Sequence, residues 1–300
     1  MSLISLSTAL GGDLRLMVRG RESVLLCLAA MMLFAASDIV AKYLSLTLHP
    51  LQIAWFRYLA AAILLVVVWV RQGGAVRSAA PMAQVMRGLG MAGSTLLLIA
   101  SLSLQPVVEA TALVFISPCI VTVLCVLILK ERVPPWRWVG VFGGLIGVLI
   151  LLRPGFASYN PASLLSIASA ACWAVALVMT RRAVVADTLV TTLAYSALTG
   201  FILLSAALPF VFQAAPPAQL VLGVATAVLW LGAHVAIAFA YRRPEAQVSR
   251  LAPISYTHLL WATGFGYLVF GTIPDGVTIA GAAFIIASGL LAGRGERQSA

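Results

Sequence analysis

Residues 101–155 read SLSLQPVVEATALVFISPCIVTVLCVLILKERVPPWRWVGVFGGLIGVLILLRPG, and this stretch decides the class of fold. It holds two apolar runs, 106–128 and 135–152, with a short charged segment between them. A hydrocarbon core about 30 Å thick needs roughly 20 helical residues, so each run is long enough to cross a bilayer. Continuous apolar runs also argue against a membrane β-barrel, whose strands alternate apolar and polar residues. The stretch therefore predicts two consecutive transmembrane helices.

The same pattern extends over the whole chain. Of its 300 residues, 62% are hydrophobic and only 9% are charged, too few polar side chains to cover a water-soluble globule. No cleavable signal peptide is expected, because the first apolar run continues into Asp38 and Lys42. We predict an all-α integral membrane protein with ten transmembrane helices. Their expected ranges are 22–44, 50–71, 82–103, 106–128, 135–152, 160–182, 190–211, 218–240, 248–270 and 276–293.

The net charge of +10 follows the loops between these helices. With the N-terminus inside, 16 of the 19 basic residues fall in cytoplasmic segments, as the positive-inside rule requires. These are Arg15, Arg19, Arg21, Arg71, Arg77, Arg87, Lys130, Arg132, Arg137, Arg181, Arg182, Arg242, Arg243, Arg250, Arg294 and Arg297. The basic residues thus predict orientation in a bacterial-type inner membrane, with both termini cytoplasmic. We expect no nucleic-acid partner.

The two halves of the chain resemble each other. A shift of 139 positions places Phe34 on Trp173 and Lys42 on Arg181. Because each half contains five spans, an odd number, the second copy must enter the membrane upside down. Two inverted copies can exchange conformations, so that one chain opens to either side in turn. The expected division is an N-terminal cytoplasmic segment 1–21, a first repeat 22–155, a second repeat 156–293 and a cytoplasmic tail 294–300.

The opening stretch also carries a family resemblance. Its mid-helix Pro118, its Glu131-Arg132 pair at the cytoplasmic exit and its glycine-rich fifth helix resemble the EamA repeat of the drug/metabolite transporter superfamily. The matching stretch 252–291 has Thr272 where that family often has an acidic residue. The resemblance covers about 20–293 and implies a ten-helix transporter. Among such members the chain is most similar to bacterial amino-acid exporters of the YddG type, which implies export of aromatic or neutral amino acids.

Two prolines lie at related places in the two repeats. Pro118 and Pro253 each remove a backbone hydrogen bond from a predicted helix. In carriers, helices interrupted at matching places point to a substrate site near the bilayer midplane. The alternative is a static kink relieved by neighbouring serine hydroxyls.

Charged residues inside the spans are candidates for coupling or gating. Asp38 is the only carboxylate well inside a predicted span, and such residues are costly in lipid. It either carries a proton or forms a structural pair with Lys42, four residues later, which Arg57 would join. Glu109 lies near the outer mouth, where a solvated rim position is the alternative to a gating role.

Aromatic and histidine side chains predict where a substrate binds. Histidine is the side chain that can change charge near physiological pH, which makes His234 and His258 candidates, although a histidine inside a membrane also serves as an interhelical hydrogen-bond group. We expect an aromatic-lined cavity suited to apolar groups and to cation–π contact with an ammonium. Its predicted lining is Ser94, Phe115, Trp173, Trp230, His234, Tyr256, His258 and Trp261. No metal site is predicted.

Two kinds of glycine motif occur in the predicted spans. The motif at 88–93 matches GxGxxG, but it lies in an apolar helix with no preceding strand, so a dinucleotide site is not expected. GxxxG pairs within 140–147 and at 289–293 predict close approach of the fifth and tenth helices, within one chain or in a homodimer.

These features together predict a secondary transporter that works by alternating access. Its expected partners are a small-molecule substrate and the lipid bilayer, it needs no cofactor, and it is a monomer or a homodimer. No GxxxxGK[ST] motif is present, so energy must come from gradients. A vitamin or nucleotide-type compound is the alternative substrate. A membrane-embedded enzyme or a channel is less favoured, because the sequence has no HExxH or GxSxG motif and no TVGYG-type filter.

Overall fold

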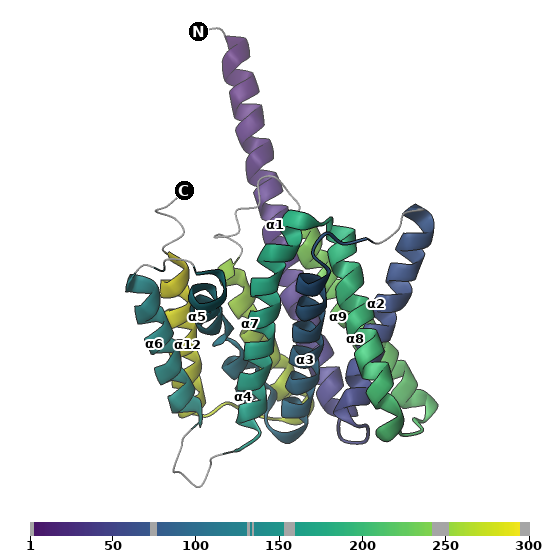
Figure 1. Cartoon of the computed structure of the whole chain (residues 1–300). Helices are drawn as coiled ribbons and strands as arrows, with labels where there is room; N and C mark the ends of the chain where they lie inside the picture. Colours follow the sequence, from purple (N-terminus) through teal and green to yellow (C-terminus); the bar gives the residue numbers. More distant parts are fainter. Residues whose placement is uncertain are drawn as a thin grey trace.

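The computed structural model describes residues 3–72, 77–130, 133, 135–152, 160–241 and 252–294, and no strand occurs among them (Figure 1). The helices are α1 (Leu3–Leu44), α2 (Pro50–Gln72), α3 (Pro81–Leu104), α4 (Val107–Val114), α5 (Ser117–Leu129), α6 (Pro135–Leu152), α7 (Ser163–Ala186), α8 (Leu189–Ala207), η1 (Leu208–Phe210), α9 (Pro217–Tyr241), η2 (Ala252–Tyr256), α11 (Thr257–Phe270) and α12 (Gly276–Arg294). Taken as single spans, α4 with α5 and η2 with α11 bring the total to the ten predicted. The Glu131-Arg132 pair and residues 248–251 of the predicted ninth span lie outside the described residues.

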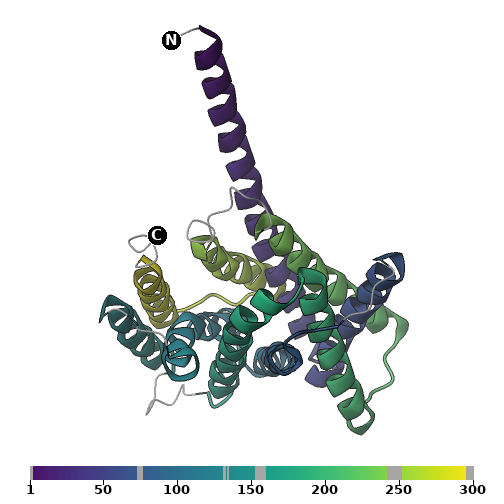
Figure 2. The same ribbon diagram turned by 45° about the horizontal axis from the view of Figure 1, so that its top comes forward.

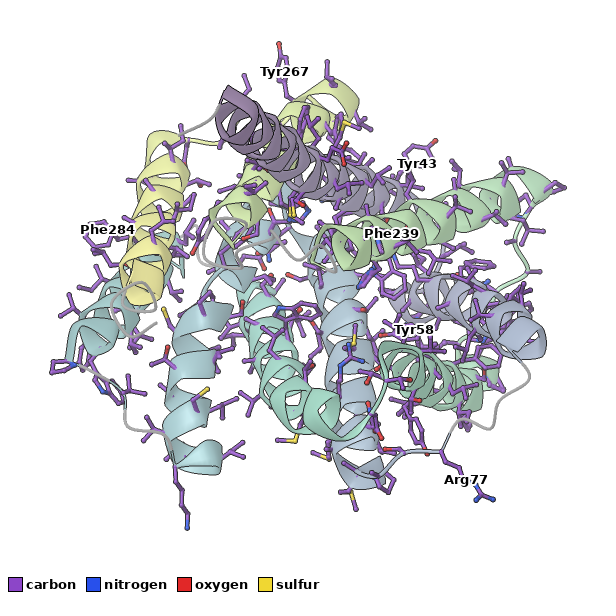
Figure 3. The ribbon with its side chains drawn as sticks, turned by 90° about the horizontal axis from the view of Figure 1, so that it is seen from above. Tyr43, Tyr58, Arg77, Phe239, Tyr267 and Phe284 are labelled. Atoms are coloured by element: carbon purple, nitrogen blue, oxygen red, sulfur yellow. The ribbon has the colours of Figure 1, made fainter. Side chains whose placement is uncertain are left out.

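The helices have the lengths and surfaces of membrane spans. Within the described residues, seven are long and apolar enough to cross a bilayer, and shorter apolar helices lie in α6 and α12. Tyr43, Tyr267 and Phe284 point away from the bundle (Figure 3) and are 52%, 55% and 46% exposed, as expected for side chains that face lipid. Helix α1 begins on the side where α12 ends (Figure 1), which requires an even number of spans. Figure 2 shows the first part of α1 extending beyond the other helices.

Helix packing reveals the inverted repeat. Helix α1 packs on α9, and its counterpart five spans later, α7, packs on α3. Likewise α2 packs on α9, and its counterpart α8 packs on α3. Each pair thus recurs with the two halves exchanged, which is the relation between two inverted five-helix repeats.

Contacts also divide the molecule into two bundles that cut across the repeats. The first bundle consists of α1, α2, α9 and η2 with α11, and the second bundle consists of α3, α4 with α5, α7 and α8. Helices α6 and α12 pack on each other at one edge of the molecule (Figures 1 and 2). Each bundle therefore takes helices from both repeats.

Glycines allow the closest of these helix contacts. A Cβ atom on Gly147 of α6 would lie 2.9 Å from the backbone nitrogen of Ile285 and 3.1 Å from the carbonyl oxygen of Gly281, both on α12. A Cβ on Gly90 of α3 would lie 2.7 Å from the carbonyl oxygen of Cys172 on α7. The glycines of the GxGxxG match and of the first GxxxG pairs therefore serve helix packing within the chain.

Both proline-containing spans are interrupted. Helix α4 ends at Val114 and α5 begins at Ser117, and Pro118 in its first turn has no N–H to donate to the Val114 carbonyl. In the second repeat the 3₁₀ segment η2 precedes α11. Phe115 lies at the first interruption and Tyr256 at the second, 141 positions apart. The interruptions thus place one aromatic residue from each repeat near the middle of the molecule.

Candidate functional site

A buried ion pair lies inside the first bundle. Arg57 Nη2 on α2 is 3.0 Å from Asp38 Oδ1 on α1, and these residues are 1% and 4% exposed. Arg57 Nε also donates to Thr226 Oγ1 on α9 at 3.2 Å. His258 Nε2 on α11 lies 3.4 Å from Asp38 Oδ2. Four helices thus meet at one neutralised pair of charges, which lowers the cost of keeping either charge away from water.

The pairing of Asp38 with Lys42 suggested by their spacing is wrong. Lys42 Nζ instead donates to the carbonyl oxygens of Leu102, at 2.9 Å, and Gln105, at 2.6 Å. These carbonyls lie at the C-terminus of α3, where backbone acceptors lack helical partners and the helix dipole attracts a cation. The Glu109 carboxylate in the first turn of α4 also interacts electrostatically with Lys42. Lys42 therefore connects the first bundle to the second.

A continuous chain of aromatic rings runs past the ion pair. The successive centroid distances are 5.4 Å for Tyr58–Trp230, 4.2 Å for Trp230–His234, 4.8 Å for His234–Phe34, 6.4 Å for Phe34–His258, 6.2 Å for His258–Phe115 and 5.1 Å for Phe115–Tyr256. Five of the residues predicted for the substrate site belong to this chain. Because Phe115 comes from the second bundle and the other rings from the first, the chain crosses from one bundle to the other.

A cavity of about 300 Å³ lies between the bundles next to these rings. Its lining includes Tyr58, Leu64 and Leu65 of α2, Met91 of α3, Leu193 and Ala197 of α8, and Trp230, His234, Val235 and Phe239 of α9. These positions lie in the half of the helices nearer to the start of α1. Leu64, Leu193 and Val235 are 40%, 40% and 37% exposed, so protein does not seal the cavity on every side. Among the described residues, no aspartate, glutamate, lysine or arginine lines it.

At the opposite end, hydrogen bonds join the bundles. Trp55 Nε1 on α2 donates to Ser205 Oγ on α8 at 2.9 Å. The Gln52 side chain donates to the Gln213 carbonyl and accepts from its backbone N–H, both at 2.9 Å. Together with Lys42, these contacts hold the bundles together where α1 ends. The bundles are therefore joined by hydrogen bonds at the face where α1 ends. Toward the other face the cavity opens between them, and Leu65 of α2 packs on Ala194 and Ala197 of α8.

Six of the eight predicted substrate residues do not line this cavity: Phe115, Tyr256 and His258 belong only to the chain of rings, and the other three lie elsewhere. Ser94 on α3 bonds with Ser169 Oγ at 3.1 Å and accepts from it at its carbonyl at 2.8 Å, so its hydroxyl is used to pair α3 with α7. Trp261 stacks on Phe265 at 6.0 Å and is 37% exposed. Trp173 is partly buried on α7 and does not belong to the described lining. Pro253 lies in η2, and its side chain is outside the described residues.

Sequence reasoning missed several residues that complete the site. Ser37 Oγ donates to the Thr226 carbonyl at 2.8 Å, and Thr226 Oγ1 donates to the Ser37 carbonyl at 3.1 Å, which ties α1 to α9. Phe34 had one signal, because the internal repeat places it on Trp173. Tyr58 and Thr226 had none, since a single hydroxyl in an apolar span makes no pattern.

Outside the membrane, Asp187 fastens the loop between α7 and α8 to the start of α3. Its carboxylate accepts hydrogen bonds from the backbone N–H of Ala79 at 2.8 Å, from Gln84 Nε2 at 2.7 Å and from the Ser78 hydroxyl. The hydrogen bonds from Gln84 and Ser78 hold the pKa of Asp187 below its usual range. An anion at this position also complements the N-terminal end of the α3 dipole.

Comparison with known proteins agrees with this architecture. Residues 21–153 match the EamA-like transporter family. The chain is 28% identical over 269 residues to an S-adenosylmethionine uptake transporter of Rickettsia prowazekii, covering 88% of this chain and 89% of the relative. It is 34% identical over 191 residues to a riboflavin transporter of Vibrio cholerae, covering 61% of each. It is 26% identical over 273 residues to a pseudopaline exporter of Pseudomonas aeruginosa, covering 89% and 94%.

A solved crystal structure has the same fold. It covers 93% of this chain and 99% of its own, with a TM-score of 0.62 and 19% identity.

Proposed function

This chain carries an EamA-like transporter domain and belongs to the drug/metabolite transporter superfamily, and we propose that it moves a small metabolite across the inner membrane by alternating access. The observation that carries the proposal is the open cavity between two bundles that are joined at the opposite membrane face. A carrier needs a site that is reached from one side at a time, and this arrangement supplies one. Since each bundle contains helices of both repeats, exchange of the repeat conformations would close this end and open the other.

The cavity favours a flat, largely uncharged ring system. Tyr58, Trp230 and His234 supply aromatic faces, and the remaining lining is almost entirely apolar. The relatives carry S-adenosylmethionine and riboflavin, which both contain a fused heteroaromatic ring. We therefore propose these two compounds as the first candidates. None of the relatives described above is an amino-acid carrier, so the aromatic and neutral amino acids expected from sequence come after them. The relatives include both uptake and export proteins, so the direction of transport must be determined by experiment.

We further propose that both termini are cytoplasmic. The distribution of basic residues supports this orientation. The test uses single cysteines at Arg77 and Leu46, which are both exposed and lie in loops at opposite faces. An impermeant thiol reagent added to intact cells should label the cysteine at 46 and leave the one at 77 unlabelled. The reverse pattern would contradict the orientation.

Transport itself is tested by counterflow in proteoliposomes. Liposomes preloaded with unlabelled S-adenosylmethionine or riboflavin should accumulate the labelled compound transiently above equilibrium, with saturable kinetics. Uptake that is linear with concentration and lacks counterflow would indicate a channel, and chemical conversion of the compound would indicate an enzyme. Either result would overturn the proposal.

Two tryptophans test whether the cavity is the binding site. Trp230→Ala should weaken binding at least about tenfold, because a buried aromatic contact contributes a few kcal/mol. Trp261→Ala is the matched control, because this ring lies away from the cavity. An equal loss in both variants would show general destabilisation instead of a local effect on binding.

A further inference from the structure

His234 is held rigidly in the wall of the cavity. Its ring centroid lies 4.2 Å from that of Trp230 and 4.8 Å from that of Phe34. Its Nδ1 atom lies 3.0 Å from the backbone carbonyl oxygen of Trp230, one turn earlier on α9. Two ring contacts and one polar contact thus fix both the position and the orientation of the imidazole.

The contact with Trp230 also fixes the tautomer of the neutral ring. A carbonyl oxygen only accepts hydrogen bonds, so Nδ1 must carry the hydrogen, and Nε2 of His234 is then an acceptor. Nε2 is not one of the buried polar atoms without a partner, and no described residue donates to it. His234 lines the cavity, so a ligand there lies beside the ring that carries this acceptor.

The rest of the described lining offers little competition for this acceptor. Ser196, another polar lining residue, donates its hydroxyl to the Thr192 carbonyl at 3.0 Å. Tyr58 presents its ring to Trp230, and its hydroxyl is buried without a hydrogen-bond partner among the described residues. Nε2 of His234 is therefore an acceptor in an apolar wall, and a ligand that covers it without donating a hydrogen bond forfeits the bond that water makes there.

We propose that His234 selects substrates by a hydrogen bond from a ring-edge N–H group. The compound that the cavity takes is a flat heteroaromatic metabolite whose edge carries an amino group or a ring N–H. That group donates to Nε2 of His234 while the ring face lies against the neighbouring aromatic side chains. This inference rests on the proposed function, since it assigns the substrate class of the same cavity.

The test compares ligands with and without this donor. Riboflavin is compared with its N3-methyl derivative, and S-adenosylmethionine with the analogue that has hydrogen in place of the 6-amino group. Binding to the purified full-length protein is measured by isothermal titration calorimetry. For at least one pair, the parent compound should bind about tenfold or more tightly than its partner, as expected for the loss of one buried hydrogen bond.

Two variants assign the effect to His234. His234→Phe keeps a ring and removes the acceptor, so the parent compound and its partner should bind equally. His234→Gln retains an acceptor oxygen and should keep part of the preference. Monodispersity and thermal unfolding confirm that each variant is folded, and if His234→Phe fails this check, the wild-type comparison and His234→Gln decide.

Failure of the His234 contact and failure of transport give different results. Equal binding of both members of each pair to the wild type, or a preference that persists in His234→Phe, would overturn the role of His234 and leave the transporter intact. If neither parent compound binds or is transported, the substrate proposal above is overturned, and this inference with it.

Discussion

Arg57 neutralises the buried charge of Asp38. Its side chain reaches Asp38 because α1 and α2 run antiparallel from a short connection, which brings positions 38 and 57 to the same depth. The groups that touch the pair, from Thr226 and His258, also belong to the first bundle. Movement of one bundle against the other therefore leaves the pair intact. This arrangement favours a structural role for Asp38 over a role as proton carrier.

Asp38→Asn should accordingly destabilise the protein strongly. The substitution leaves the buried Arg57 guanidinium without its counter-charge, which costs about 3–5 kcal/mol in comparable buried pairs. Thermal unfolding in detergent measures the loss, and Asp38→Asn combined with Arg57→Met should recover part of it. Asp38→Asn combined with Lys42→Met is the control, and it should not recover stability, since Lys42 does not contact Asp38. A stable Asp38→Asn variant that transports normally but no longer responds to a pH gradient would show that Asp38 carries the proton.

Asp187 should make stability depend on pH in the acidic range. Its pKa is lower in the folded protein than in the unfolded chain, so its stabilising effect is present above its ordinary value, about 3.9, and is lost as pH falls through the lower folded value. The unfolding temperature of the wild type should therefore exceed that of Asp187→Asn near pH 6, and the difference should shrink below about pH 4. A constant difference over the whole range would contradict the assignment.

At the scale of elements, close helix contacts depend on single glycines. Helices α6 and α12 approach until backbone meets backbone at Gly147 and Gly281. Without a hydrophobic driving force between helices in lipid, such close packing supplies much of the association energy. The fifth and tenth spans are thereby fixed to each other, one from each repeat.

Gly147→Ala should therefore destabilise the α6–α12 contact by about 1–3 kcal/mol, the usual cost of overpacking. Gly264→Ala on α11 is the matched control, because a Cβ there meets nothing within 4 Å and alanine favours the helix. Thermal unfolding of both variants in the same detergent gives the comparison. Equal unfolding temperatures for the two variants would show that the two helices are free to separate.

The elements were predictable and most of their contacts were not. Apolar length alone placed spans such as α6 and α12 within a residue of their observed bounds, because the bilayer imposes a minimum helix length. The position of Pro118 likewise predicted the break between α4 and α5. Side-chain contacts between different helices depend on how the spans pack, and the spacing of residues within one span does not predict this packing. That is why the spacing suggested Lys42 as one possible partner for Asp38 and why it gave no indication of Thr226.

At the scale of the whole molecule, the moving bodies differ from the sequence repeats. The cavity lies between the first bundle and the second, and each bundle mixes helices from both halves of the chain. Ser37 with Thr226 ties α1 to α9 inside one bundle, and Ser94 with Ser169 ties α3 to α7 inside the other. These hydroxyl contacts favour motion of two rigid bundles over bending of single helices.

Lys42 should act as a latch that holds the outer end closed. Its ammonium bridges from α1 to carbonyls at the end of α3, in the other bundle. Lys42→Met removes hydrogen bonds made by a charged donor, each contributing about 1.5–3 kcal/mol, and should shift the population toward opening at that end. A cysteine replacing the buried Val107 should then react with an external thiol reagent about tenfold faster or more than in the Lys42 background. An unchanged rate would rule out the latch.

The most direct test of alternating access is a pair of distances between the bundles, measured by double electron–electron resonance in proteoliposomes. Spin labels replace exposed residues in a background without Cys27, Cys119, Cys125 and Cys172: Val67 with Met86 at the cavity end, and Tyr43 with Leu104 at the other. When a transported ligand is added, we predict a new population in which the first distance is shorter and the second is longer. If both distances stay unchanged while the same preparation transports the ligand, or both change in the same direction, the two bundles do not alternate.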